Sequence, residues 1–150
     1  MNRCRSLAAL VASAVSATGC FDHSSTQTSP SSAGDPRVIT ADQLSGNWNL
    51  ASIQPAGHAD QATPAGASYT LTFADGRMVT RADCNLCNGT FTLLGHTLTA
   101  GPALACTRAA CPTMAFENGY TSLLSGDSTV TLSSGALVLS SSRGVLRFTR

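Results

Sequence analysis

Four cysteines lie close together near the middle of this 150-residue chain, and they restrict its folding more than any other feature. They occur as C-N-L-C at 84–87 and as C-T-R-A-A-C at 106–111. Cysteines at such spacings serve as structural disulfides, as a C-x-x-C redox centre or as a four-cysteine zinc site. Redox centres of this type usually begin a helix in a βαβ unit, whereas the flanking segments here have patterns of consecutive strands. Two disulfides are therefore the leading interpretation, with redox and zinc chemistry as alternatives.

The pairing of the four cysteines follows from antiparallel geometry. Residue numbers of partners on two antiparallel strands have a nearly constant sum, and this holds for Cys84 with Cys111 and for Cys87 with Cys106. The sequence therefore predicts two nested bridges. The crossed pairing, Cys84 with Cys106 and Cys87 with Cys111, suits this geometry less well, and a Cys84–Cys87 bridge would favour the redox interpretation. No metal and no cofactor are predicted.

The N-terminal segment has the pattern of an export signal. Two arginines lie within residues 1–5, and an apolar run follows at 7–17. As a helix this run would be about 16 Å long, roughly half of a membrane's hydrocarbon core, so it suits a signal peptide better than a membrane span. It ends in A-T-G-C, which resembles the lipobox of bacterial lipoproteins. The resemblance implies a signal peptide over 1–19 and a lipid on Cys20; cleavage after Ala17, leaving a free Cys20 thiol, is the alternative.

The lipoprotein resemblance also implies a location. Phe21, rather than Asp, follows the cysteine, which favours the outer membrane with the domain facing the periplasm. Residues 20–39 are rich in Ser, Thr, Pro and Gly and are predicted to be a flexible tether, in which His23 has no ligand role. Without residues 1–19 the chain keeps seven Arg and eight Asp or Glu. That balance implies no basic surface, so nucleic acid is not a predicted partner. The lipid anchor predicts contact with the membrane, and the sequence does not identify a protein or small-molecule partner.

Residues 40–150 form the predicted folded domain, which begins with a strand at 44–53. Trp48, Leu50 and, after a change of register, Ile53 would point inward, and Trp48 is interpreted as a core residue rather than an exposed binding platform. The composition of 55–66 indicates a loop in which His58 and Asp60 are solvated and unconstrained. Strand alternation over 69–73, the dipeptide Asp75-Gly76 and a return over 77–81 predict a β-hairpin with a type I′ turn.

The rest of the domain shows strand patterns and one helical pattern. Residues 84–89 have the composition of a turn, and His96 is expected to be exposed at a second turn. Apolar residues at helical spacing predict a helix over 113–124, with Pro112 near its start and Gly126 after its end. Glu117 on this helix is expected to face solvent or a neighbouring Arg. The further strands are predicted at 90–94, 96–99, 129–132, 136–139 and 145–148. The fold prediction is mainly β: a small antiparallel barrel-like roll of about eight strands with one α-helix.

The order of several motifs resembles that of the META-domain family, which includes HslJ-type heat-shock lipoproteins. These motifs are L-S-G-N-W-N-L, S-Y-T-L-T-F-A-D-G-R, C-N-x-x-N-G-T-F and T-R-A-A-C-P followed by F-E-N-G-Y-T-S-L-L, and together they cover 44–148. The positions that match the family pattern are Gly46, Trp48, Cys84, Asn85, Gly89 and Cys111. Cys87 stands where an aromatic residue is more usual, and Cys106 also departs from the pattern, which a second bridge would explain. The resemblance implies a barrel-like β fold with one helix.

The resemblance also implies a role in envelope stress or antibiotic tolerance without enzymatic activity. No Ser-His-Asp or comparable catalytic set can be recognised in the sequence. The leading functional hypothesis is therefore a non-enzymatic envelope lipoprotein that acts by binding or structural support. Two alternatives remain: a binder of small ligands or proteins at the mouth of the barrel, with the 55–66 loop as its rim, and a thiol oxidoreductase that uses Cys84 and Cys87.

Overall fold

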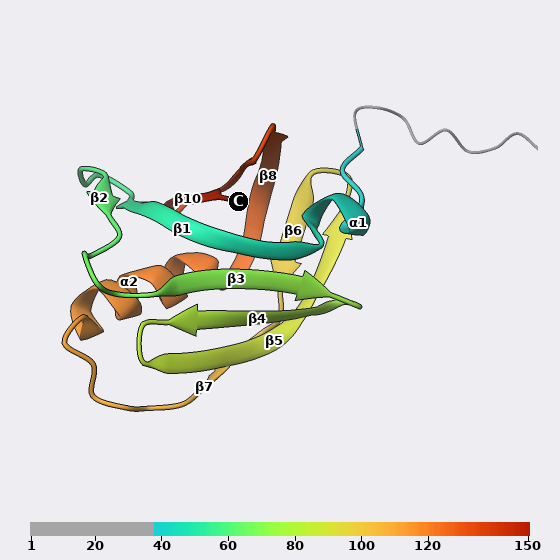
Figure 1. The fold of residues 1–150 in the computed structure, drawn as a ribbon. Coiled ribbons are helices and arrows are strands. Elements are labelled where there is room, and N and C mark those ends of the chain that lie inside the picture. Colours follow the sequence, from blue (N-terminus) through green and yellow to red (C-terminus); the bar gives the residue numbers. More distant parts are fainter. Residues whose placement is uncertain (1–37) are drawn as a thin grey trace, which may run out of the picture. The chain divides into compact units, whose positions relative to one another are not determined.

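The computed structural model describes residues 38–150 (Figure 1). The predicted signal peptide, the lipidated Cys20, His23 and nearly all of the predicted tether therefore lie outside the described residues. Within the described part, ten strands and two helices follow one another along the chain. They are α1 (Ala41–Leu44), β1 (Gly46–Pro55), β2 (Gln61–Ala62), β3 (Tyr69–Ala74), β4 (Arg77–Ala82), β5 (Asn85–Leu94), β6 (Thr97–Ala100), β7 (Ala105–Cys106), α2 (Met114–Leu124), β8 (Gly126–Ser133), β9 (Ala136–Ser141) and β10 (Gly144–Thr149).

Eight of the strands form a closed antiparallel barrel. Their order around the barrel is β1, β3, β4, β5, β6, β8, β9 and β10, and the pairing of β1 with β10 closes it. The two-residue strands β2 and β7 are additions, paired with β1 and β5 respectively. Closure removes the unpaired sheet edges that promote aggregation. The predicted fold class, a mainly β antiparallel barrel with about eight strands, is confirmed.

Side chains fill the interior of the barrel. Residues alternate between buried and exposed along most strands, as in β4, because successive side chains of a strand point to opposite faces. The buried apolar cluster includes Trp48, Phe73 and Phe148 and contains residues of all eight barrel strands. Helix α2 lies across the end of the barrel where β3 begins, and α1 lies near the opposite end (Figure 1).

Strand β1 contains the predicted change of register. Its pairing with β10 shifts between Leu50 and Ser52, which marks a β-bulge. An extra residue at this point lets Leu50 and Ile53 both face the core, where they are 5% and 2% exposed. Trp48 is 2% exposed, and its indole Nε1 donates a hydrogen bond to the Leu44 carbonyl oxygen at 2.8 Å. Its predicted role as a core residue is confirmed.

The hairpin and the helix agree with their predictions within one or two residues. Asp75 and Gly76 both have positive φ, 50° and 72°, as a type I′ turn requires. Helix α2 begins at Met114 rather than at residue 113, because Thr113 has non-helical backbone angles and lies at the N-cap position. Gly126, two residues after the end of α2, has a φ of 75°.

The turn predicted at 84–89 is wrong for most of that segment. Strand β5 begins at Asn85 and pairs with β4 through Asn88 and Gly89. Asn and Gly favour turns in isolation, but pairing with neighbouring strands overrides such preferences. Asn85 and Cys87 then face inward, and Leu86 and Asn88 face outward. The short elements α1, β2 and β7 have no counterpart in the prediction.

Candidate functional site

Both predicted disulfides are present. Cys84 is bonded to Cys111 and Cys87 to Cys106, across sequence separations of 27 and 19 residues. Cys87 and Cys106 are also direct partners in the pairing of β5 with β7. Cys84 and Cys87 therefore belong to different bridges and do not form a C-x-x-C disulfide. Over residues 38–150, no group of three His, Cys, Asp or Glu side chains lies close enough to hold a metal ion.

Asn85 is the centre of a buried hydrogen-bond network between the two bridges. Its carbonyl oxygen Oδ1 accepts hydrogen bonds from the Ala109 backbone N–H at 2.7 Å and from the Thr107 hydroxyl at 2.9 Å. Its amide nitrogen Nδ2 lies 3.0 Å from the Ala109 carbonyl oxygen. Asn85 is 2% exposed. A single side chain thus holds the backbone of the 107–109 segment in place, where regular secondary structure is lacking.

Glu117 on α2 completes the network and corrects a prediction. Glu117 was expected to face solvent or an arginine, but it is only 7% exposed. Both of its carboxylate oxygens lie 3.0 Å from Asn85 Nδ2, and no arginine of the described chain forms an ion pair with it. The helical pattern alone could not show that Glu117 is buried. The burial of this side of α2 depends on how the disulfide-linked segment packs against the helix.

A cavity of about 440 Å³ lies between α2 and the segment that connects β6 to α2. Its lining residues include the polar Asn85 and Glu117 and the cationic Arg108. Leu104 and Met114 contribute apolar surface, and Met114 is 42% exposed. The remaining lining residues are Cys106, Thr107, Ala109, Ala110, Asn118 and Thr121. The volume falls in the range of about 300–1,000 Å³ that is typical of small-molecule sites.

Tyr120 fixes α2, and with it the cavity wall, against the barrel. Its hydroxyl oxygen lies 2.6 Å from the Thr80 hydroxyl of β4, which in turn donates to the Thr70 carbonyl oxygen at 2.7 Å. Burial raises the pKa of Tyr120, and the hydrogen bond with Thr80 opposes that shift. Burial is also the main cause that raises the pKa of Tyr69, whose ring packs edge-on against Tyr120 at 5.4 Å. Folding therefore favours the neutral, protonated form of both tyrosine side chains.

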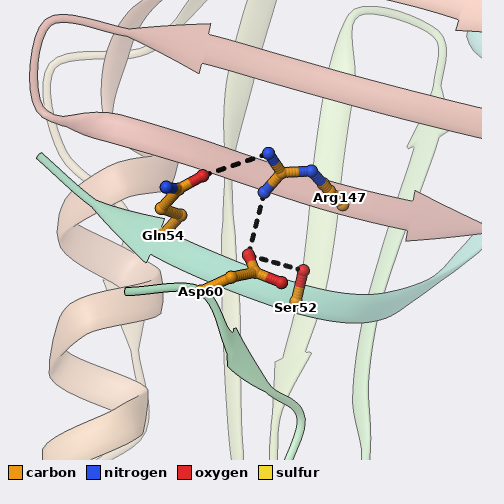
Figure 2. Close-up of polar contacts among 4 residues, drawn as sticks. All are labelled: Ser52, Gln54, Asp60 and Arg147. Carbon is orange, nitrogen blue, oxygen red and sulfur yellow. Dashed lines mark hydrogen bonds and ion pairs between the residues drawn. The ribbon is translucent and has the colours of Figure 1, made fainter. Parts of the chain in front are cut away.

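The loop at 55–66 is held against the outside of the barrel (Figure 2). Asp60 accepts a hydrogen bond from the Ser52 hydroxyl at 3.0 Å and forms an ion pair with Arg147 at 2.9 Å. Arg147 also donates to the Gln54 side-chain oxygen at 3.1 Å. The prediction that nothing constrains Asp60 is thus wrong, although its side chain is half exposed. His58 is exposed as predicted, and no residue of this loop lines the cavity beside α2.

The remaining motif positions have structural roles. Gly46 has a φ of 106°, and Arg150 places its guanidinium 4.0 Å from the centre of the Trp48 ring. A Cβ atom at Gly89 would lie 2.9 Å from Leu104 Cδ2, so glycine at this position permits the segment over β5 to pack closely. His96 is exposed, as predicted.

The architecture defines a class of protein: a small closed β-barrel with one helix across its end and a disulfide-linked segment beside that helix. The META domain family model matches residues 42–150. The chain belongs to the META domain family, and the predicted family is confirmed.

Two solved structures share the fold. An NMR structure of a protein from Burkholderia xenovorans is 24% identical, with a TM-score of 0.61, and the match covers 79% of this chain and 92% of that one. A second NMR structure is 23% identical, with a TM-score of 0.59, and the match covers 74% and 94% of the two chains. No curated protein matches the sequence. In residues 38–150 neither helix has the length and apolar character needed to cross a bilayer.

Proposed function

We propose that this protein is a non-enzymatic lipoprotein of the bacterial envelope that contributes to stress or antibiotic tolerance by binding a partner or by structural support. The observation that carries the proposal is the pair of nested disulfides beside a partly polar cavity. Such bridges persist in an oxidising compartment outside the cytoplasm. The export signal and the cysteine at 20 point to the same compartment.

A binding role suits the cavity better than a catalytic one. Glu117 is the carboxylate on its wall, and neither His58 nor His96 lines it. A single buried carboxylate without a neighbouring base or nucleophile offers hydrogen-bond acceptors and charge, which are means of recognition. The alternative site at the barrel mouth, with the 55–66 loop as rim, receives less support because apolar side chains fill the barrel interior.

Location and anchoring can be tested by fractionation and mass spectrometry. We expect the mature protein in the outer-membrane fraction, with a lipid on Cys20 and with the domain accessible only from the periplasm. A Cys20→Ser variant should be released as a soluble protein. An unmodified Cys20 thiol in the native membrane fraction would refute the anchor.

The physiological role can be tested with a deletion strain of the source bacterium. Loss of the protein should reduce survival after heat shock or on envelope-active antibiotics. The wild-type protein should restore survival, and the soluble Cys20→Ser variant should restore it less. Survival equal to that of the parent strain under all these conditions would count against a tolerance role.

A further inference from the structure

The cavity beside α2 has a buried carboxylate whose hydrogen-bonding capacity is only partly used. A carboxylate offers about four acceptor positions, and an amide NH2 group has two hydrogens. Four acceptor atoms lie within 3.2 Å of Asn85 Nδ2: Ala109 O, Cys111 Sγ and the two Glu117 carboxylate oxygens. Two hydrogens cannot serve four acceptors fully, and Glu117 is one of the residues that line the cavity. Its carboxylate therefore has acceptor capacity beyond the hydrogen bonds to Asn85.

Glu117 lies in the first turn of α2, where the helix N-terminus favours a carboxylate, but it has no ion-pair partner among the described residues. The only ion pair among residues 38–150 joins Arg147 to Asp60, outside the barrel. A buried charge is costly unless it is paired, so a cationic group in the cavity would gain more here than on the surface. A bare metal ion does not fit, since such ions require several oxygen ligands and no such group exists in the described part of the chain. An organic ammonium, which brings its own N–H donors, suits a single carboxylate better.

Arg108 supplies the opposite charge on the same cavity. It is exposed and takes no part in the one ion pair of residues 38–150. Guanidinium groups bind carboxylates in a bidentate manner. One negative and one positive wall group together favour a ligand with one charge of each sign. Leu104, Met114 and Ala110 add apolar surface for an uncharged side chain.

We propose that the cavity binds small zwitterions of the amino-acid or short-peptide class, with the ligand ammonium on Glu117 and the ligand carboxylate on Arg108. This inference rests on the proposed binding role and specifies its ligand. Asn85 then has a positioning role: it fixes the Glu117 carboxylate and the 107–109 backbone in the same place. The outer disulfide, whose Cys111 sulfur lies 3.2 Å from Asn85 Nδ2, fixes the segment in turn.

The test uses the dipeptide alanyl-leucine and the isotope-labelled full chain in detergent micelles, followed by ¹H–¹⁵N NMR. We expect saturable shifts of amides in 104–121, with a dissociation constant on the order of 1 mM or lower. N-acetyl-alanyl-leucine lacks the ammonium and alanyl-leucinamide lacks the carboxylate. Acetylation should weaken binding by about tenfold or more, and amidation by a smaller factor, because Arg108 is exposed to solvent.

Two variants assign the contacts. Glu117→Gln keeps the size of the side chain but removes its charge, and should weaken the free dipeptide about as much as acetylation does. Arg108→Gln alters an exposed side chain and should reduce the discrimination against the amidated dipeptide. Asp75→Asn is the matched control, because it removes a carboxylate at the distant β3–β4 turn and Asn tolerates the positive φ there. If Glu117→Gln does not fold, the capped dipeptides test the same contact in the unaltered protein.

The proposal is overturned if alanyl-leucine gives no saturable shifts up to about ten times the expected dissociation constant. It is also overturned if the acetylated dipeptide binds equally well, or if the shifts lie outside 104–121. If the dipeptide does not bind but the deletion strain still loses tolerance, the ligand proposal is wrong and the proposed envelope role stands. If the dipeptide binds but the deletion strain has no phenotype, the envelope role is wrong and the ligand proposal stands.

Discussion

Removal of the two disulfides, singly and together, tests whether they act by restricting the unfolded chain. In a loop-entropy treatment, closing the 19-residue separation of Cys87–Cys106 alone stabilises by about 3.3 kcal/mol. Closing the 27-residue separation of Cys84–Cys111 alone stabilises by about 3.6 kcal/mol. Because the loops are nested, the outer bridge closes only about ten free residues once the inner bridge has formed, which is worth about 2.7 kcal/mol.

The nesting predicts a departure from additivity. Removing the outer bridge should cost about 2.7 kcal/mol, removing the inner one about 2.4 kcal/mol, and removing both about 6 kcal/mol. The double loss therefore exceeds the sum of the single losses by about 1 kcal/mol. Alanine at Cys87, which is fully buried, also loses some packing. That loss enters the single and the double variants alike, so it does not alter the difference.

Urea unfolding, followed by tryptophan fluorescence, measures these values. Trp48 is the only tryptophan of the chain, is 2% exposed and lies on β1, outside the bridged segment. The variants are Cys84→Ala with Cys111→Ala, Cys87→Ala with Cys106→Ala, and all four together. A loss of about 6 kcal/mol is a large part of the stability of a typical domain. The wild type and the three variants are therefore compared in the same concentration of sucrose, which stabilises the folded state. Single losses well below 1 kcal/mol, or a double loss no larger than their sum, would refute the reasoning.

Four further predictions concern contacts elsewhere in the domain. Tyr120→Phe leaves the Thr80 hydroxyl without its partner and should cost about 1 kcal/mol in urea unfolding; an unchanged midpoint would contradict the role of Tyr120 in holding α2. Tyrosine ionises near pH 10.0 in the unfolded chain but at higher pH in the folded one. The free energy of unfolding should therefore fall as pH rises above about 10, and less steeply in Tyr120→Phe; equal pH profiles would exclude this linkage. Gly144→Ala places a Cβ against the Gln54 carbonyl and 2.8 Å from Pro55 Cα at a φ of 145°, and should cost at least about 2 kcal/mol by the same measurement; a loss below 0.5 kcal/mol would show that β1 and β10 can separate there. Asp60→Asn should change stability by less than about 1 kcal/mol, because the ion pair with Arg147 is half exposed, while proteolysis of the 55–66 loop should become faster.

The barrel could be predicted from the sequence because its signals are local. Alternation over 69–73, the Asp75-Gly76 turn and the helical spacing from Met114 to Leu124 each depend on residues close together in the chain. The disulfide pairing was also predictable, since antiparallel strands impose a simple relation between the residue numbers of partners. Closure through the pairing of β1 with β10 joins segments about a hundred residues apart, and no local pattern encodes it.

The site was harder to predict than the fold. Asn85 has the local character of a turn residue, and Glu117 that of a residue on the exposed side of a helix. Only the packing of α2 against the disulfide-linked segment brings the two side chains within 3.0 Å of each other. Their separation of 32 residues, across two bridges, leaves no sequence pattern that links them. The family resemblance identified Asn85 as a motif position but did not indicate its partner.

The two disulfides and Asn85 act on the same weak point of the fold. The segment from Gly101 to Thr113 contains only the two-residue strand β7 as regular structure, and most of its side chains are at least partly exposed. A segment with so few buried contacts would open easily if it were held by packing alone. The bridges attach it to β5 at Cys84 and Cys87, and Asn85 binds its backbone between them. Because it is already ordered before a ligand arrives, little conformational entropy remains to be lost on binding. Reduction of the bridges should therefore weaken ligand binding at the cavity even under conditions in which the barrel itself stays folded.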